Sequence, residues 1–165
     1  MTVPWLETAK SLIGTREVPS SKSSPTILAW AKRLGSRILG IAYTDDATAW
    51  CGLFVAHCVS TAGLTPAPIA VRASAWATWG VDVRADRLAP GVILVFSRKG
   101  GGHVGFYVGE DATTYSVLGG NQSDAVSVTR ILKNRCVARR WPASVAMTGA
   151  PVWASGKGAI STNEA

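Results

Sequence analysis

The chain has 165 residues, of which 47% are hydrophobic, and this length and composition predict one globular domain with a core of its own. No apolar run is long enough to cross a membrane, and the N-terminus lacks the basic and apolar regions of a secretory signal. The net charge of +7 predicts an anionic partner or surface, with ordinary solubility as the alternative, and the densest basic patch comprises Lys133, Arg135, Arg139 and Arg140.

The first half of the chain predicts helices. Apolar residues at helical spacing, together with proline near the start and glycine near the end, favour helices over residues 4–13, 24–35, 51–63 and 73–79. Residues 36–42 form a connector that the pattern does not place. A proline-bearing loop over residues 66–71 is expected between the third and fourth helices.

After Pro90 the pattern changes to strands separated by turn residues. Strands are predicted over residues 91–96, 103–108, 114–118, 125–131 and 136–141. Helices followed by an antiparallel meander predict the α+β class. Residues 1–142 would form the domain, and residues 143–165, which are rich in Ala, Ser, Gly and Thr, are expected to be a flexible C-terminal tail.

Cys51 is the candidate nucleophile. It lies in the first turn of a predicted helix, after Asp45, Asp46 and Thr48, whose side-chain oxygens are suited to capping a helix start. The positive end of the helix dipole favours the thiolate, which is the nucleophilic form of cysteine. The alternative is that Cys51 is a small buried hydrophobic residue.

The other cysteines and the histidine count argue against a disulfide scaffold and a zinc site. Cys51 and Cys58 would lie about 10 Å apart along one helix, too far for a disulfide, and Cys136 leaves an odd number. There is no C-x2-C motif, and the only histidines are His57 and His103.

His103 is the candidate base, because it opens a strand directly after a glycine-rich turn. The next strand ends in Gly119-Gly120-Asn121, and neighbouring antiparallel strands can bring Asn121 beside the imidazole, where its amide would hold the ring and tautomer. Such a set has the nucleophile, base and orienting residue of acyl transfer. A tight turn is the alternative for Gly-Gly-Asn. His57 lies about 120° from Cys51 around the helix and should face elsewhere.

Four stretches in this order carry a resemblance to a known family: residues 49–54 (Ala-Trp-Cys-Gly-Leu-Phe), 91–96, 102–108 (Gly-His-Val-Gly-Phe-Tyr-Val) and 118–122 (Leu-Gly-Gly-Asn-Gln). Together they resemble the NlpC/P60 and CHAP superfamily of cell-wall cysteine hydrolases, over about residues 4–142. Where NlpC/P60 members commonly have Asp-Cys-Ser-Gly, residues 50–53 read Trp-Cys-Gly-Leu, which is closer to the CHAP side and leaves the bond specificity open.

The resemblance implies a papain-like fold and a role for each matching residue. Cys51 would be the nucleophile and His103 the general base and then acid. Asn121 would orient His103, or Gln122 would do so if the register differs by one residue. The candidate substrate-binding residues are Tyr43, Trp50 and Gln122.

No cofactor or metal is implied by the catalytic set. Some CHAP relatives bind calcium through aspartates near the cysteine, and Asp45 and Asp46 lie at that place. Calcium requires six or more oxygen ligands, so helix capping is the favoured interpretation of this pair.

The resulting functional prediction is a peptidoglycan hydrolase that cleaves an amide bond through a cysteine thioester. The bond would be the N-acetylmuramoyl–L-alanine amide or a peptide bond of the stem or cross-bridge. The expected protein is a monomer of the phage endolysin type, made in the cytoplasm, reaching the wall through a holin or a secretion system and held there by its positive charge. An inactive wall-binding or structural protein of the same fold is the alternative. Nucleic-acid binding would rest on charge alone and is not expected.

Overall fold

The computed structural model describes residues 3–18, 24–41, 49–98, 101–154, 159–162 and 164, and these form an α+β structure. The helices are α1 (Pro4–Ser11), α2 (Pro25–Leu34), α3 (Ser36–Leu39) and α4 (Cys51–Thr61), with short 3-10 helices η1 (Ala73–Thr78) and η2 (Lys133–Arg135). The strands are β1 (Val81–Asp82), β2 (Ile93–Arg98), β3 (Gly101–Glu110), β4 (Thr114–Gln122), β5 (Ala125–Leu132) and β6 (Cys136–Trp141). The predicted α+β class is confirmed. No helix in the described part of the chain is long and apolar enough to span a membrane.

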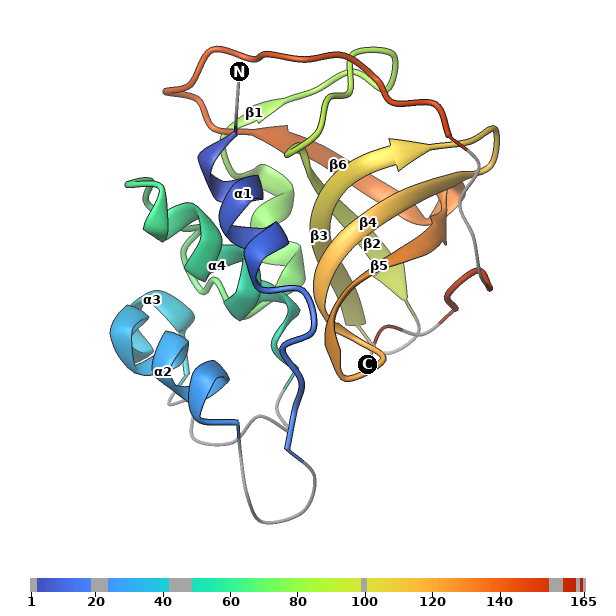
Figure 1. Cartoon of the computed structure of the whole chain (residues 1–165). Coiled ribbons are helices and arrows are strands. Elements are labelled where there is room, and N and C mark those ends of the chain that lie inside the picture. The colour runs from blue at the N-terminus through green and yellow to red at the C-terminus, as the bar shows by residue number, and fades with distance from the viewer. Residues whose placement is uncertain are drawn as a thin grey trace.

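The six strands form one antiparallel sheet in the order β1-β6-β2-β3-β4-β5. Consecutive strands β2 to β5 are neighbours, as a meander requires, and β6 returns to the other side of β2. Register shifts interrupt the pairing of β3 with β4 and of β4 with β5. Such irregularities bend strands, and the sheet curls strongly in Figure 1.

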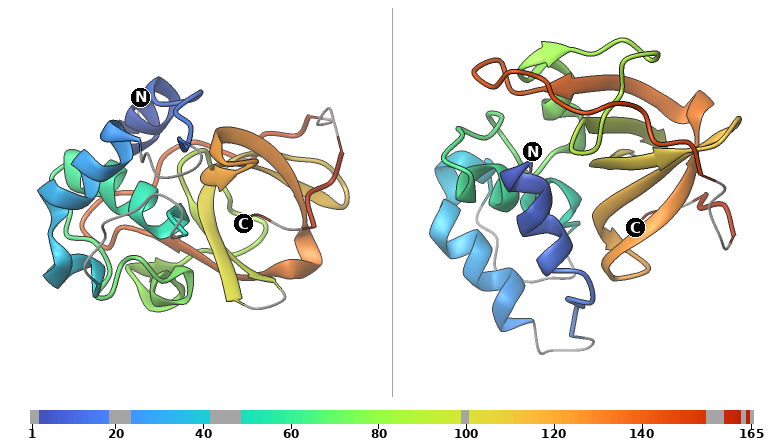
Figure 2. Two further views of the ribbon diagram at one scale, coloured as in Figure 1. Left: turned by 90° about the horizontal axis from the view of Figure 1, so that it is seen from below. Right: turned by 45° about the horizontal axis from the view of Figure 1, so that its top comes forward.

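The helices lie on one side of the sheet, with α4 between the sheet and the outer helices α2 and α3 (Figures 1 and 2). Helix α4 contacts α1 and α2 as well as β3 and β4. Most of its side chains are buried, which explains why its sequence is apolar on nearly every side. The start of α2 follows the predicted signal, because the Ser24 Oγ atom accepts a hydrogen bond from the Ile27 N–H.

The C-terminal segment differs from the predicted flexible tail. Trp153 forms a bridge with Glu110 at the end of β3, and Ile160 forms a bridge with Arg130 in β5. Figure 1 shows residues 142–154 running back across the top of the sheet. The described parts of this segment therefore pair with the sheet through their backbone. Backbone pairing does not depend on apolar side chains, so the small and polar composition of the segment did not predict it.

Helix α4 approaches β4 so closely that glycine is required at the contact. A Cβ atom on Gly120 would lie 2.7 Å from the Cβ atom of Phe54 and 2.8 Å from the Trp50 ring. Glycine inside a strand often marks a place where another chain segment comes close, and at Gly120 that segment is the helix.

We expect Gly120→Ala to destabilise the fold by about 1–3 kcal/mol, because the added methyl group would push α4 away from β4. The matched control is Gly101→Ala, where the nearest atom to a new Cβ lies at 3.9 Å. Urea unfolding of both variants would check this. Equal stability of the two variants would contradict the close contact.

Candidate active site

Cys51 is the first residue of α4 and lies at the wall of an open cleft. Its side chain is nearly buried, with 4% exposed, and it faces a cleft of about 610 Å³. The other walls come from the segment 71–77, from the end of β2 and from the start of β3. Most of the lining side chains are small or apolar, with Arg72 at the rim: Ala49, Val71, Arg72, Ala73, Ser74, Ala77, Val95, Phe96, Ser97, Gly101, Gly102 and Val137.

The residue after the cysteine is glycine for a steric reason. A Cβ atom on Gly52 would lie 2.2 Å from the carbonyl oxygen of Ala70 and 2.7 Å from that of Val71. The loop before η1 therefore passes directly over the first turn of α4. Ile69 enters this loop with φ of 55°, a conformation that β-branched residues rarely adopt. The tight passage brings Val71 and Arg72 to the cleft beside Cys51.

Burial dominates the electrostatics of the Cys51 thiol. Desolvation raises its pKa above the ordinary value, while the backbone N–H groups of Val104 and Gly52 and the charge of Arg98 act in the opposite direction. The thiol is therefore neutral at pH 7 in this structure, whereas the helix-dipole argument from the sequence favoured the thiolate. The Val104 N–H belongs to the peptide that joins it to His103, so the thiol lies against the β3 backbone at the residue next to the candidate base.

His103 lies on β3 with its side chain fully buried, and its Nε2 atom lies 2.9 Å from the Gln122 Oε1 atom. The Gln122 amide is held in one orientation, because its Nε2 atom donates to the carbonyl oxygens of Val117 at 3.1 Å and Ser127 at 2.7 Å. Its oxygen must then accept from His103, so the His103 proton is assigned to Nε2. The Nδ1 atom has no hydrogen-bond partner among the described residues and keeps its lone pair.

The same burial keeps the imidazole neutral. Desolvation lowers the pKa of His103 to about 4, while the hydrogen bond to Gln122 and the charge of Glu164 raise it, and Arg98 and Arg135 lower it. A neutral ring with a free Nδ1 lone pair is the form that a general base requires. The site thus combines a neutral thiol with a neutral base.

The structure places the other candidate residues in different surroundings. Gln122, not Asn121, holds His103. This is the arrangement expected if the register of the strand differs by one residue. Asn121 is buried in the irregular stretch between Gly119 and Gln122, with φ of 60°. That left-handed residue shifts the strand, and this shift is why counting along an ideal strand selected the wrong amide.

Trp50 was expected to bind substrate, and the structure contradicts this. Its ring has no exposed surface, packs against Gly120, and donates from Nε1 to a Glu17 carboxylate oxygen at 2.8 Å. Gln122 is 2% exposed and serves the His103 ring instead of a substrate surface. Tyr43, Asp45, Asp46 and Thr48 lie outside the described residues.

The predicted basic patch is largely engaged in internal contacts. Lys133 pairs with Glu110 at 2.8 Å, and Arg135 pairs with Glu164 at 2.6 Å. Arg139 donates to the Val83 carbonyl oxygen, and Arg140 donates to that of Trp79. The sequence could not show this, because the partners are 23 or more positions away.

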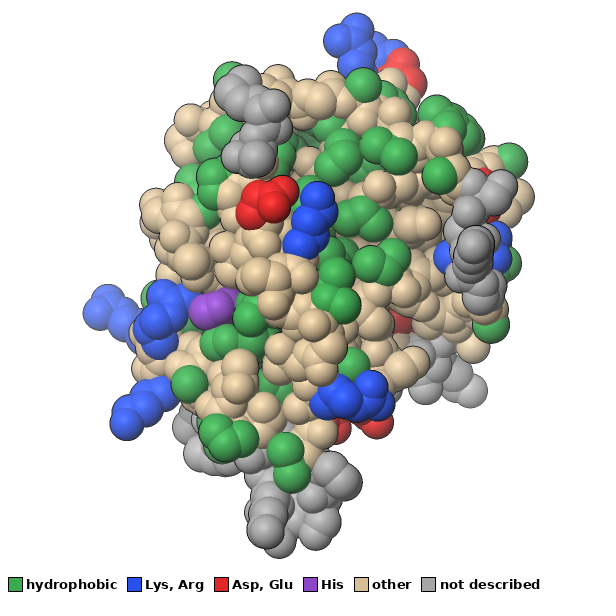
Figure 3. Space-filling model, in the orientation of Figure 1, with side chains coloured by type: hydrophobic (Ala, Val, Ile, Leu, Met, Phe, Trp, Pro, Cys, Tyr) green, Lys and Arg blue, Asp and Glu red, His purple; other side chains and the backbone are tan. Residues whose placement is uncertain are grey.

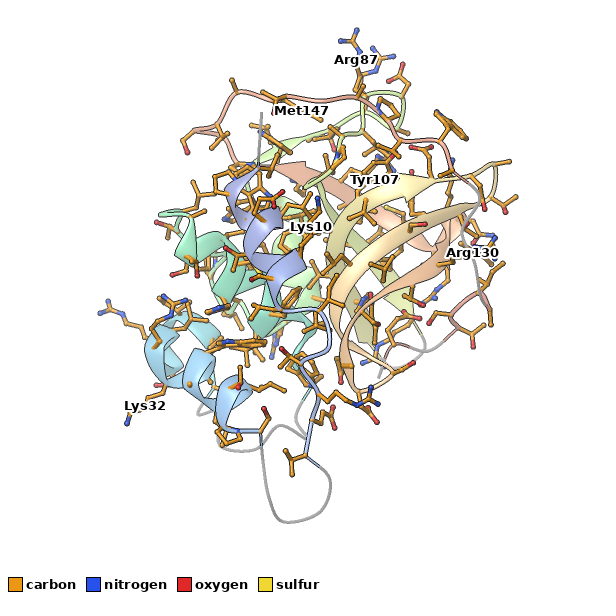
Figure 4. The ribbon with its side chains drawn as sticks, viewed as in Figure 1. Lys10, Lys32, Arg87, Tyr107, Arg130 and Met147 are labelled. Atoms are coloured by element: carbon orange, nitrogen blue, oxygen red, sulfur yellow. The ribbon has the colours of Figure 1, made fainter. Side chains whose placement is uncertain are left out.

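Exposed positive charge gathers instead over α2 and α3, at the lower left of Figure 3. Lys32, Arg33 and Arg37 are exposed there and make no ion pair with any other described residue. Lys32 points away from the protein in Figure 4. The expectation of an anionic partner therefore concerns this basic helix face, formed by Lys32, Arg33 and Arg37, rather than residues 133–140.

His57 faces away from the site, as predicted. It stacks on Trp30 at 4.8 Å and its Nδ1 atom lies 3.0 Å from an Arg33 nitrogen. Cys58 is fully buried on α4, and burial raises the pKa of its thiol well above the usual range. No group of three or more His, Cys, Asp or Glu side chains that could hold a metal ion occurs in the described ranges.

Comparisons with known proteins do not identify a relative. No protein-family model matches the chain, and neither the curated proteins nor the solved structures include a match.

We expect Gln122→Ala to change the ring nitrogen chemical shifts of His103 and to lower stability by about 1–3 kcal/mol, because it leaves the buried Nε2–H without an acceptor. Asn121→Gly is the control, since glycine keeps the positive φ of this position. Nitrogen-15 NMR of the histidines and urea unfolding would check both variants. If the His103 signals change in Asn121→Gly but not in Gln122→Ala, then Asn121, and not Gln122, holds the ring.

Stability should fall as the pH drops from 6.5 towards 4. The pKa values of His103 and His57 are both lowered from 6.5 to about 4, so the unfolded chain binds protons that the folded protein excludes. For fully buried His103 the loss between pH 7.5 and 5 should be roughly 1–2 kcal/mol. Urea unfolding across this range measures the loss, and His57→Gln isolates the part that belongs to His103. Constant stability of this variant from pH 7.5 to 5 would refute a neutral buried His103.

Proposed function

We propose that this protein is a cysteine hydrolase of papain-like arrangement that cleaves an amide bond of peptidoglycan. The observation that carries the proposal is the position of Cys51. It opens a buried helix at a cleft wall, against the His103–Val104 peptide, and Gln122 holds the His103 ring in the tautomer that a base needs. The candidate nucleophile, base and orienting amide thus come from three separate parts of the chain: Cys51 lines the cleft, its thiol lies against the backbone next to His103, and Gln122 holds the His103 ring.

The chemistry begins with transfer of the thiol proton to His103. In the structure the Nδ1 atom makes no hydrogen bond to the thiol, so the Sγ atom must move within reach of Nδ1 when substrate enters. The thiolate then attacks the amide carbonyl carbon, and the Cys51 backbone N–H stabilises the resulting oxyanion. His103 protonates the leaving amine and a thioester forms. Water, activated by His103, hydrolyses the thioester and restores the thiol.

The Gln122 contact serves both halves of this cycle. Because the Gln122 amide is fixed by Val117 and Ser127, it keeps the Nε2 proton in place while Nδ1 gains and loses the mobile proton. The Val104 N–H favours the thiolate at the moment it forms. These two features oppose the desolvation that keeps the resting pair neutral.

The assignment of peptidoglycan as substrate rests on the resemblance and on two supporting features. The small side chains around the cleft suit a narrow chain with small substituents near the bond that is cut. The basic helix face of α2 and α3 suits an anionic wall polymer, which it would hold without a separate binding domain. Either the N-acetylmuramoyl–L-alanine amide or a peptide bond meets these requirements.

A catalytically inactive wall-binding protein is the second candidate. It is favoured by the neutral, buried state of both Cys51 and His103 and by the missing hydrogen bond to Nδ1. Such a protein would use the cleft or the basic helix face without turnover.

We expect wild-type protein to release soluble fragments from isolated peptidoglycan under reducing conditions, and Cys51→Ala to lower the rate at least about 10³-fold. Cys58→Ala is the matched control, because Cys58 lies on the same helix, fully buried in the core. Mass spectrometry of the fragments, with an assay of new amino groups, identifies the bond.

Equal fragment release by wild type and Cys51→Ala would refute the cysteine mechanism. Binding of both proteins to the wall without release, across several wall types, would favour the inactive binder. Loss of wall binding on substitution of Lys32, Arg33 and Arg37 by glutamine would then locate the binding surface on α2 and α3.

A further inference from the structure

Glu164 is a buried carboxylate for which the mechanism above has no use. Its side chain has no exposed surface, although it belongs to the C-terminal segment. Both of its oxygens accept hydrogen bonds from Arg135, at 2.6 and 3.0 Å, and one also accepts from Ser161 Oγ at 2.6 Å. A paired arginine and carboxylate with this geometry is a strong and directional contact.

The ion pair lies against the wall of the cleft. The Nε atom of Arg135 donates to the Ser97 carbonyl oxygen at 3.1 Å, and Ser97 is one of the residues that line the cleft with Cys51. In the β2–β3 ladder, Ser97 pairs with Gly102 and Phe96 pairs with His103. Arg135 is therefore bound to Ser97, which is the neighbour in β2 of Phe96, the residue paired with the candidate base His103.

The charges that act on His103 come from three elements. Arg98 on β2 and Arg135 on η2 are positive, and Glu164 is the negative group. Gln122 on β4 is its neutral hydrogen-bond partner, and Cys51 at the start of α4 is the proton donor of the proposed reaction. Without Glu164 the charge of Arg135 would be uncompensated, and two guanidinium groups would oppose protonation of the ring.

We propose that Glu164 is a positioning residue for His103: its carboxylate holds Arg135 on the end of β2 and balances the positive charge beside the imidazole. The imidazolium that forms when Cys51 loses its proton is then stabilised from the side of the C-terminal segment. This inference rests on the proposed function in taking His103 as the base. Its main test is independent of turnover.

The test uses histidine NMR titration, which is simple here because the chain contains only His57 and His103. Glu164→Gln removes the charge and keeps the shape, Glu164→Asp keeps the charge, and Ser161→Ala removes one hydrogen bond but neither charge. We expect the His103 pKa to fall by about 0.5–1 unit in Glu164→Gln, to stay near the wild-type value in the other two, and the His57 pKa to remain constant.

The double variant Arg135→Gln/Glu164→Gln separates charge from structure. Because it removes both members of the pair, its His103 pKa should return towards the wild-type value, whereas a purely structural role predicts the largest disturbance in this variant. In wall hydrolysis, Glu164→Gln should lower kcat about threefold to tenfold with little change in KM, and should move the acidic limb of the pH profile to lower pH.

An unchanged His103 pKa in folded Glu164→Gln, or a larger shift in the double variant than in the single one, would overturn the inference. Absence of wall hydrolysis by wild type would instead refute the proposed function, and the titration would still decide whether Glu164 acts on His103. A Glu164→Gln protein that fails to fold while the double variant folds would also support the charge balance, since only the single variant leaves the partly buried Arg135 without its carboxylate partner.

Discussion

The structure depends on the burial of α4 between the sheet and the other helices. An apolar helix can occupy this position only if its neighbours allow the backbones to approach, and glycine allows this at two contacts near the start of α4. Gly52 lets the loop before η1 cross the first turn of the helix, and Gly120 lets β4 lie against Trp50 and Phe54. Because Cys51 is the first residue of that helix, the same packing decides where the thiol lies and how little of it solvent reaches.

The surroundings of Cys51 and His103 follow from this burial. Water is replaced by a few fixed dipoles: the Val104 N–H at the sulfur atom and the Gln122 carbonyl oxygen at the ring. In such surroundings each single charge matters more than it would in water, which is why Arg98, Arg135 and Glu164 all affect the ring. The resting pair is neutral, and the energy to form the ion pair has to come from substrate binding and from these preorganised groups.

Local patterns in the sequence predicted the fold class, the order of the longer helices and strands, the position of Cys51 at a helix start and that of His103 on a strand, but not the short elements α3 and β1. The Ser24–Pro25 start and the strands after Pro90 are signals within a few residues, and these are dependable. The choice between Asn121 and Gln122 was wrong by one position because a left-handed residue breaks the alternation of side chains. The docking of the tail, the pairing of the basic residues and the burial of Trp50 depend on partners far along the chain, and no local pattern contains them.

The outer edge of β5 shows a consequence of the tail that concerns the solubility of the chain. Arg16 bridges to Ala125 at one end of this strand, and Ile160 bridges to Arg130 towards the other. A strand with an open edge offers unpaired N–H and C=O groups to any other extended chain, and this is a common route to aggregation. The segment from the start of the chain and the segment from its end thus shield β5 together. A protein shortened to residues 1–142 would keep Cys51 and His103 but would expose part of this edge, in the same strand as the Val128 side chain, which is already half exposed.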